Sequence, residues 1–206
     1  MSYLKLAEHY EECYKKHGDN HLGLDWPNKE DTLKRHKVML ELTKRDNDGP
    51  CTLLDFGCGT SAFYEYILSE GHSTKIKYSG LDINLSLLEK AQEKFPNTTF
   101  YHMDILKVQN IPNFDYMICN GVFTEKRDLT QEEMFIFFSE VIKKLWNKTN
   151  KGIAFNLMSK QVDWERKDLF HVSLDKLGWF LKENLTRSFL IRNDYGLYEY
   201  TTYVYK

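Results

Sequence analysis

Several features that this 206-residue chain lacks exclude whole functional classes of protein. Net charge is almost lacking, because 28 Lys and Arg residues oppose 30 Asp and Glu residues. A dedicated nucleic-acid binder normally carries a basic surplus, so we expect no nucleic-acid partner. No stretch reaches the roughly 18 apolar residues that a membrane helix needs, so we expect no membrane span. The first residues also meet charge too early to form the apolar core of a signal peptide.

Cysteine pairing is lacking as well. The four cysteines, Cys13, Cys51, Cys58 and Cys119, show neither a CxxC motif nor the spacing of a disulfide framework. This usage is typical of reduced thiols in a cytoplasmic protein, and it predicts neither disulfides nor a metal site.

The sequence does contain enough apolar residues for one domain of ordinary size. Its hydrophobic fraction is 42%, and aromatic residues alone contribute 15%. This composition excludes a disordered chain. A chain of this length buries roughly 70% of its unfolded surface, so we expect one sizeable core.

From residue 51 onward, apolar runs of strand length alternate with helical patterns. The predicted strands are 51–56, 76–82, 98–103, 114–119 and 153–158. Because parallel neighbours need crossover helices, the alternation predicts a parallel sheet. Two alternating runs within 187–203 flank an Asn-Asp-Tyr-Gly turn and predict a closing antiparallel hairpin.

The first fifty residues differ from the rest, because they are charged and contain no strand-like run. Helical spacing covers 3–16, and a second helix is expected after Trp26, with Asn28 or Asp31 as its cap. Turn-forming residues at 45–50 mark a boundary. We therefore predict a helical lid over 1–50, within the same domain as a core at 51–206.

The strongest functional signal is a strand that runs directly into two glycines. In segment 53–61, Leu-Leu-Asp-Phe-Gly-Cys-Gly-Thr-Ser, Gly57 and Gly59 permit a sharp turn. A bare backbone there lets a ligand approach the start of the following helix. Asp55 precedes the glycines at the end of a buried strand, where an unused charge would be costly.

Polar or glycine residues also follow the next three strands. Asp82 and Asp104 end the second and third strands, and Asn120 with Gly121 ends the fourth. An acid in the position of Asp82 can accept hydrogen bonds from both hydroxyls of a ribose. Open α/β sheets bind ligands at this carboxyl edge, so the pattern predicts a nucleoside-containing ligand.

Together these motifs resemble the class I S-adenosylmethionine-dependent methyltransferases. The resemblance implies a doubly wound, seven-stranded mixed sheet of Rossmann-like type, in the order 3-2-1-4-5-7-6, with helices on both faces. It implies S-adenosylmethionine as the cofactor and S-adenosylhomocysteine as its product, with Arg35 pairing with the donor's carboxylate. The residues that it assigns to the cofactor are Trp26, Arg35, Asp55, Gly57, Cys58, Gly59, Asp82, Ile83, Asp104, Ile105, Asn120 and Gly121.

Shorter segments, among them 23–26 (Gly-Leu-Asp-Trp) and 194–200 (Asp-Tyr-Gly-Leu-Tyr-Glu-Tyr), resemble a bacterial subgroup of small methyltransferases linked to surface-polysaccharide (capsule) biosynthesis. That resemblance implies a small polar acceptor, methylated on oxygen or nitrogen. A carbohydrate-related or phosphorylated metabolite is expected, acted on by a monomer or homodimer.

Methyl transfer to a hydroxyl or a protonated amine needs a general base. We rank His171 first, because it follows the fifth strand in a segment expected to overhang the pocket; the competing interpretation is a surface-loop histidine. The residues expected to contact the acceptor are Tyr10, Phe123, Phe170 and Tyr195. The aromatic residues Tyr3, Tyr14, Trp26 and Trp164 are expected to wall the same site.

Three other functions stay open. Gly57 and Gly59 followed by Ala62 also fit the dinucleotide fingerprint of an NAD-dependent oxidoreductase, although Asp55 would repel a pyrophosphate. A nucleic-acid methyltransferase is disfavoured because residues 120–123, Asn-Gly-Val-Phe, lack the Pro-Pro of that group's signature. The chain could also be a non-catalytic partner that binds the cofactor without turnover and stabilises another subunit.

Overall fold

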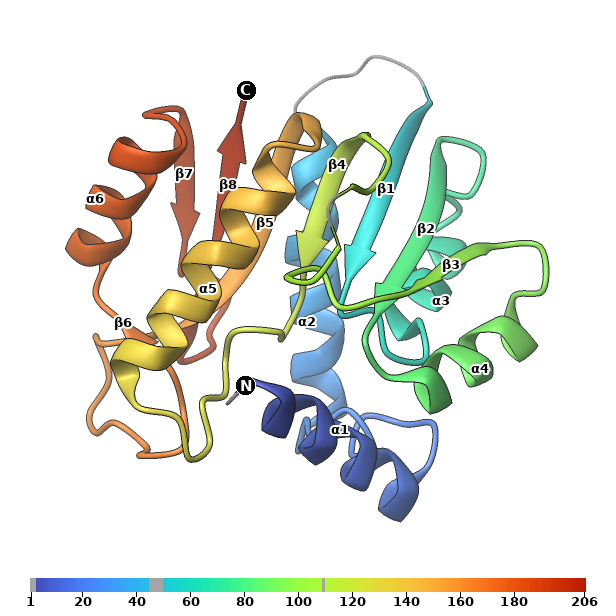
Figure 1. The fold of residues 1–206 in the computed structure, drawn as a ribbon, viewed down its shortest axis with the longest axis horizontal. Coiled ribbons are helices and arrows are strands. Elements are labelled where there is room, and N and C mark those ends of the chain that lie inside the picture. Colours follow the sequence, from blue (N-terminus) through green and yellow to red (C-terminus); the bar gives the residue numbers. More distant parts are fainter. Residues whose placement is uncertain (1–2, 45–49, 109) are drawn as a thin grey trace.

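The computed structural model describes residues 3–44, 50–108 and 110–206, and it has an α/β architecture (Figure 1). The expected turn at 45–49 lies outside these residues. The strands are β1 (Cys51–Phe56), β2 (Ile76–Asp82), β3 (Thr99–His102), β4 (Phe114–Cys119), β5 (Thr149–Ser159), β6 (His171–Val172), β7 (Phe189–Arg192) and β8 (Glu199–Tyr205). The helices are α1 (Leu4–His17), α2 (Lys29–Leu40), the 3-10 turn η1 (Glu41–Lys44), α3 (Ala62–Ser69), α4 (Leu85–Lys94), α5 (Gln131–Trp146) and α6 (Leu174–Asn184).

The sheet has the order β3-β2-β1-β4-β5-β8-β7. Neighbours from β3 to β5 are parallel, whereas β8 is antiparallel to both β5 and β7. The predicted order is confirmed. The last two strands have higher labels only because the two-residue β6, which no sequence pattern announces, pairs beside the end of β5.

Apolar side chains cover both faces of the sheet. On one face, α5 and α6 contribute Phe138, Ile142 and Leu181 to a core that also contains Leu54 and Phe155. The opposite face is covered by α2 and α3, which lie behind the strands in Figure 1. Strand residues that alternate between the two cores are buried on both sides, as expected for a parallel sheet.

The two N-terminal helices have different relationships to the core. Val38, Met39 and Leu40 of α2 are at most 3% exposed and pack on the sheet. By contrast, α1 lies across the edge toward which β1 and β4 point (Figure 1). Asn84 occupies the N-cap of α4 without a capping side-chain hydrogen bond, and its Nδ2 donates to the carbonyl of Ala7 at 2.8 Å. The covering element is therefore α1, whereas α2 is part of the packed core.

Two helix starts follow the expected capping chemistry. Asn28 Oδ1 accepts from the backbone N–H of Glu30 and of Asp31, so Asn28 is the N-cap of α2. Thr130 and Glu133 form a reciprocal capping box at the start of α5. Among the described residues, no helix combines the length and apolar character needed to cross a bilayer.

Candidate cofactor and acceptor site

A cavity of about 150 Å³ lies at the carboxyl edge of the sheet, between the strand ends and α1. Every residue that the sequence assigned to the cofactor lines it, with the exception of Arg35. The residues of that set in its wall are Trp26, Asp55, Gly57, Cys58, Gly59, Asp82, Ile83, Asp104, Ile105, Asn120 and Gly121. The motifs at four strand ends thus meet at one place, as the sheet topology requires.

The glycine turn after β1 needs its glycines. Gly57 and Gly59 have φ values of +73° and +53°, in the left-handed region. A Cβ on Gly57 would also lie 2.6 Å from the side chain of Val122. Side chains at these positions would strain the turn, and at Gly57 they would collide with the segment after β4.

Asp82 fixes the turn to the neighbouring strand. Its Oδ2 accepts from the Gly59 N–H at 2.9 Å, and its Oδ1 accepts from the Asn84 N–H at 2.8 Å. Burial raises the pKa of this carboxyl group. Because a carboxylate offers about four acceptor sites, Asp82 retains acceptor capacity beyond its backbone hydrogen bonds.

Asp55 is a buried acid, only 2% exposed, at the end of β1. The Tyr78 hydroxyl donates to its Oδ2 at 2.8 Å, and no Lys, Arg or His forms an ion pair with it in the described part of the chain. Burial raises the pKa of Asp55 to about 7, and the nearby Asp82 charge adds to the effect. A cationic ligand group would offset this cost.

Asn120 carries the clearest sign that a ligand is needed. Both polar atoms of its amide are buried and have no hydrogen-bond partner among the described residues. Such atoms normally find a partner, because leaving them unsatisfied costs about 1–3 kcal/mol. The next residue, Gly121, has a φ of +82°, and a Cβ there would lie 2.8 Å from the Trp26 ring.

Among the residues of this cavity that were not assigned to the cofactor from the sequence are Tyr3, His36 and Phe137. Tyr3 donates from its hydroxyl to Asp104 Oδ2 at 2.7 Å and stacks on Phe137, with ring centroids 5.0 Å apart. His36 is 4% exposed, and burial lowers its pKa to about 4. Tyr3 was expected to wall the site because it is an aromatic residue of the N-terminal helices. No local sequence pattern distinguishes Phe137 or His36 from core residues.

A second cavity, of about 310 Å³, adjoins the first. Tyr10 and Trp26 line both cavities, and the Tyr10 hydroxyl donates to the Gly121 carbonyl at 3.3 Å. The other residues of its wall include Asp25, Asp31, Arg35, Glu125, Asp163, Trp164, Arg166, His171, Tyr198 and Glu199. The two shared aromatic side chains therefore mark the junction between the spaces.

His171 lies in β6 and is 4% exposed, so it is not the surface-loop histidine of the competing interpretation. Its Nδ1 lies 2.6 Å from the Ser159 carbonyl oxygen, and because a carbonyl only accepts, Nδ1 must carry a proton. In the neutral ring, Nε2 is then an acceptor. Nε2 is buried without a partner among the described residues, and His171 lines the second cavity.

Arg35 lies apart from the first cavity and lines the second. Its Nε lies 3.0 and 2.9 Å from the two carboxylate oxygens of Glu199, which is 1% exposed. The guanidinium also stacks 5.2 Å from the centre of the Trp26 ring. A buried glutamate of β8 thus already neutralises Arg35, and the expected pairing of Arg35 with the donor's carboxylate stays a prediction.

Three residues expected to contact the acceptor line neither cavity. Phe123 and Phe170 are at most 1% exposed and pack around Phe138. Tyr195 hydrogen-bonds Thr201 instead, at 3.0 Å between the oxygens. Tyr14 is also outside both walls, whereas Trp164 lies in the second. The position of an aromatic residue after the end of a strand therefore does not show whether its side chain lines a cavity or packs in the core.

The first cavity fits S-adenosylmethionine on these observations. A buried acid without a cationic partner, a second acid with open acceptor capacity and an unpaired amide suit a ligand that bears an ammonium group and hydroxyls. The glycines keep the backbone bare beside them.

Comparison with known proteins agrees with a site for S-adenosylmethionine. Residues 47–172, more than half of the chain, match the family model described as "Methyltransferase domain". The chain is 26% identical over 160 residues to Rv1506c of Mycobacterium tuberculosis, provisionally named a methyltransferase, covering 76% of this chain and 94% of that one. It is 30% identical over 125 residues to the 18S rRNA (guanine-N(7))-methyltransferase of Bos taurus, covering 55% of this chain but only 42% of that one.

Among solved structures, magnesium protoporphyrin IX methyltransferase from Synechocystis, with bound S-adenosylhomocysteine, superposes with a TM-score of 0.63. The match covers 98% of this chain and 94% of that one at 15% identity, so it shows a shared fold. The chain belongs to the methyltransferase-domain family, and it is a class I methyltransferase that uses S-adenosylmethionine.

Proposed function

We propose that this enzyme methylates an oxygen or nitrogen of a small, hydroxyl-rich, carbohydrate-related molecule bound in the second cavity. The observation that carries the proposal is the unpartnered Nε2 of His171, a buried acceptor in the wall of a space adjoining the cofactor cavity. A pocket beside the donor with one such polar group is a default location for a second substrate.

Bound S-adenosylmethionine supplies a methyl group activated by a positively charged sulfur. We assign Asp55 to its ammonium group, Asp82 to its ribose and Asp104 to its adenine amine. These carboxylates line one wall, so they fix the donor's orientation relative to the junction at Tyr10 and Trp26. Holding two reactants in line supplies much of the rate for such a displacement.

His171 acts as the general base on the acceptor. Its Nδ1–H is held by the Ser159 carbonyl, so Nε2 can receive the proton that a hydroxyl or ammonium group loses on methylation. Deep burial keeps bulk water away from this nitrogen. The Ser159 carbonyl thus fixes the tautomer that a general base at Nε2 needs before any substrate binds.

The charges of the second cavity support an uncharged or cationic acceptor over a phosphorylated one. Acidic side chains outnumber basic ones in its wall. Both arginines are already engaged, Arg35 by Glu199 and Arg166 by Asp168. A phosphate or a nucleic-acid backbone would meet this acidic lining without a free cation.

Aromatic side chains at the rim support a sugar-like acceptor. Trp164 and Tyr198 belong to the second cavity, yet each is 70% exposed. Large exposed aromatic surfaces commonly mark binding sites, and their flat faces suit the C–H faces of a sugar ring. With the resemblance of the short motifs, this favours a cytoplasmic intermediate of surface-polysaccharide synthesis as the acceptor.

The test is transfer from radiolabelled S-adenosylmethionine to a panel of neutral sugars, amino sugars, sugar phosphates and RNA. We expect labelling of a neutral or amino sugar and a loss of more than a hundredfold in kcat for His171→Gln. The exposed His17 provides the matched control, His17→Gln. Labelling confined to phosphates or RNA, or full activity of His171→Gln, would overturn the proposal.

A further inference from the structure

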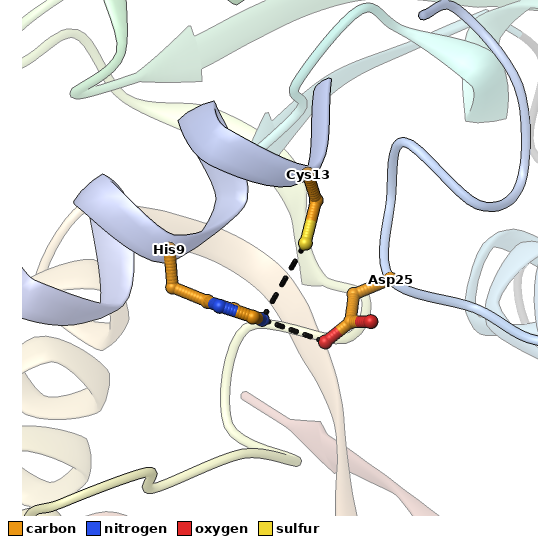
Figure 2. Close-up of side chains that lie close together, drawn as sticks. All are labelled: His9, Cys13 and Asp25. Carbon is orange, nitrogen blue, oxygen red and sulfur yellow. Dashed lines mark hydrogen bonds and ion pairs between the residues drawn. The ribbon is translucent and has the colours of Figure 1, made fainter. Parts of the chain in front are cut away.

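Three potential metal ligands meet beside the second cavity. His9 and Cys13 project from successive turns of α1, and Asp25 faces them from the turn before α2 (Figure 2). His9 Nε2 lies 2.7 Å from Asp25 Oδ2 and 3.6 Å from Cys13 Sγ. The three ligand atoms all lie within 4.8 Å of one another. None of these residues lines the cofactor cavity.

The arrangement does not match a cysteine nucleophile with a histidine base. In a catalytic arrangement of that kind, the thiol contacts one nitrogen of the imidazole ring and the acid contacts the other nitrogen, which holds the ring in the tautomer that accepts the thiol's proton. Here Cys13 and Asp25 both approach the same nitrogen, Nε2 of His9, as the dashed lines of Figure 2 show. Three donor atoms that converge on one point instead resemble a metal centre.

The ligand atoms lie close enough to close on a tetrahedral ion, since all three are within 4.8 Å of one another. Zinc bonds of about 2.0–2.3 Å imply separations of about 3.3–3.6 Å between neighbouring ligand atoms. The sulfur-to-nitrogen distance of 3.6 Å already has this value. The hydrogen-bonded His9–Asp25 pair, at 2.7 Å, would open by about 0.6 Å as the metal replaces the shared proton.

A fourth ligand is in reach. Glu125 Oε2 lies 3.6 Å from His9 Nε2, and this side chain is buried at 8% exposure. Glu125 comes from the segment after β4, so it approaches from the core, whereas His9 and Cys13 come from α1. Arg127 lies 3.4 Å from the same glutamate oxygen and would compete for it. The three-residue set does not depend on the outcome of that competition.

We propose that His9, Cys13, Asp25 and Glu125 bind a divalent, borderline-soft metal ion of the zinc type. A ligand set of one imidazole, one thiolate and two carboxylates suits zinc, because hard ions such as Mg²⁺ and Ca²⁺ take oxygen ligands. The ion links the covering helix α1 to the core at the edge of the acceptor cavity, which Asp25 and Glu125 both line. The ion would neutralise Asp25 and Glu125, two of the acids in that wall, so the charge argument against a phosphorylated acceptor applies to the metal-free protein.

The experiment titrates the chelator-treated full-length protein with Zn²⁺ against a chromophoric competitor, and with Co²⁺ followed by absorption. We expect one Zn²⁺ per chain and a thiolate-to-cobalt charge-transfer band. Cys13→Ala should abolish the band, and His9→Ala should weaken Zn²⁺ binding by more than tenfold. The matched controls are Cys51→Ala, a cysteine in β1, and His17→Ala, at the end of the same helix.

Binding of S-adenosylhomocysteine, measured on each variant, shows that the core is folded and separates this proposal from the methyl-transfer proposal. Weak or non-stoichiometric binding of Zn²⁺ to the wild-type chain would overturn the metal site. Equal binding by the Cys13 and Cys51 variants would overturn it as well, whatever the enzyme's activity.

Discussion

Arg35 and Glu199 form an ion pair that joins α2 to β8: Nε and Nη2 of Arg35 both lie 2.9 Å from Oε2 of Glu199. Hydrogen bonds extend from this ion pair toward the cofactor cavity through Asn156. Asn156 Nδ2 donates to Glu199 Oε1 at 2.9 Å, and Asn156 Oδ1 accepts from the Gly121 N–H at 2.7 Å. A buried polar chain therefore runs from an N-terminal helix to the wall of the cofactor cavity.

Removal of one partner should cost much more than removal of both. We expect Arg35→Ala to lower the free energy of unfolding by about 3–5 kcal/mol, because a nearly inaccessible Glu199 carboxylate is left unpaired. The double variant Arg35→Met with Glu199→Gln, in which no charge is stranded, should recover most of this loss. Urea denaturation of the three proteins checks it. Similar stability of the single and double variants would show that the pair is not coupled.

Gly121 keeps Trp26 against the cofactor cavity. A Cβ at Gly121 would lie 2.8 Å from the Trp26 ring, so Gly121→Ala should displace the ring and weaken S-adenosylhomocysteine binding by more than tenfold. Gly196→Ala separates this collision from backbone strain, because Gly196 has a similar φ of +74° but nothing within 4 Å of its Cβ position. Calorimetry on both variants checks the prediction. Equal losses of affinity would indicate strain alone.

The sequence predicted the core of the fold well, because its signals are local and repeated. β1 and β4 are short, mostly buried runs, and the strands from β1 to β5 alternate with helices, so that a parallel sheet brings the strand ends together. For that reason Asp55, Asp82 and Asn120 could be assigned to one cavity without any knowledge of their contacts.

Contacts between residues far apart in the chain could not be predicted from the sequence. No local pattern shows that Glu199 lies opposite Arg35, 164 positions away, whereas the family resemblance assigned Arg35 to the donor's carboxylate. Phe123 and Phe170 likewise follow strand ends, yet both point into the core around Phe138. The direction of an aromatic side chain in a loop depends on tertiary packing, which periodicity does not report.

Asp55 should make both stability and cofactor binding depend on pH. Burial raises its pKa from 3.8 to about 7, so between these pH values the folded protein without cofactor binds more protons than the unfolded chain. The free energy of unfolding should therefore fall as the pH rises from about 4 to about 7. Asp55→Asn, whose oxygen can still accept from Tyr78, should remove that slope and gain on the order of 2–4 kcal/mol at pH 8.

The same group should couple cofactor binding to proton release. A ligand ammonium group favours the carboxylate form of Asp55, so S-adenosylmethionine should bind more tightly as the pH rises toward about 7 and then level off. Calorimetry at pH 6.5 in two buffers of different ionisation enthalpy measures the released proton. A protein that binds the donor with no proton release, and with the same pH profile in Asp55→Asn, would exclude Asp55 from the ammonium site.

Asp82 provides the sharpest test of the ribose assignment, because a matched acid exists at the other edge of the sheet. We expect Asp82→Ala to weaken S-adenosylhomocysteine binding by more than tenfold, since each charge-assisted hydrogen bond contributes about 1.5–3 kcal/mol. Asp115 also accepts from a backbone N–H, that of Thr52 at 2.9 Å, but near the amino ends of β1 and β4. Asp115→Ala should therefore destabilise the fold while leaving affinity unchanged. Wild-type affinity in Asp82→Ala would remove Asp82 from the ribose site and limit its role to accepting hydrogen bonds from the backbone N–H groups of Gly59 and Asn84.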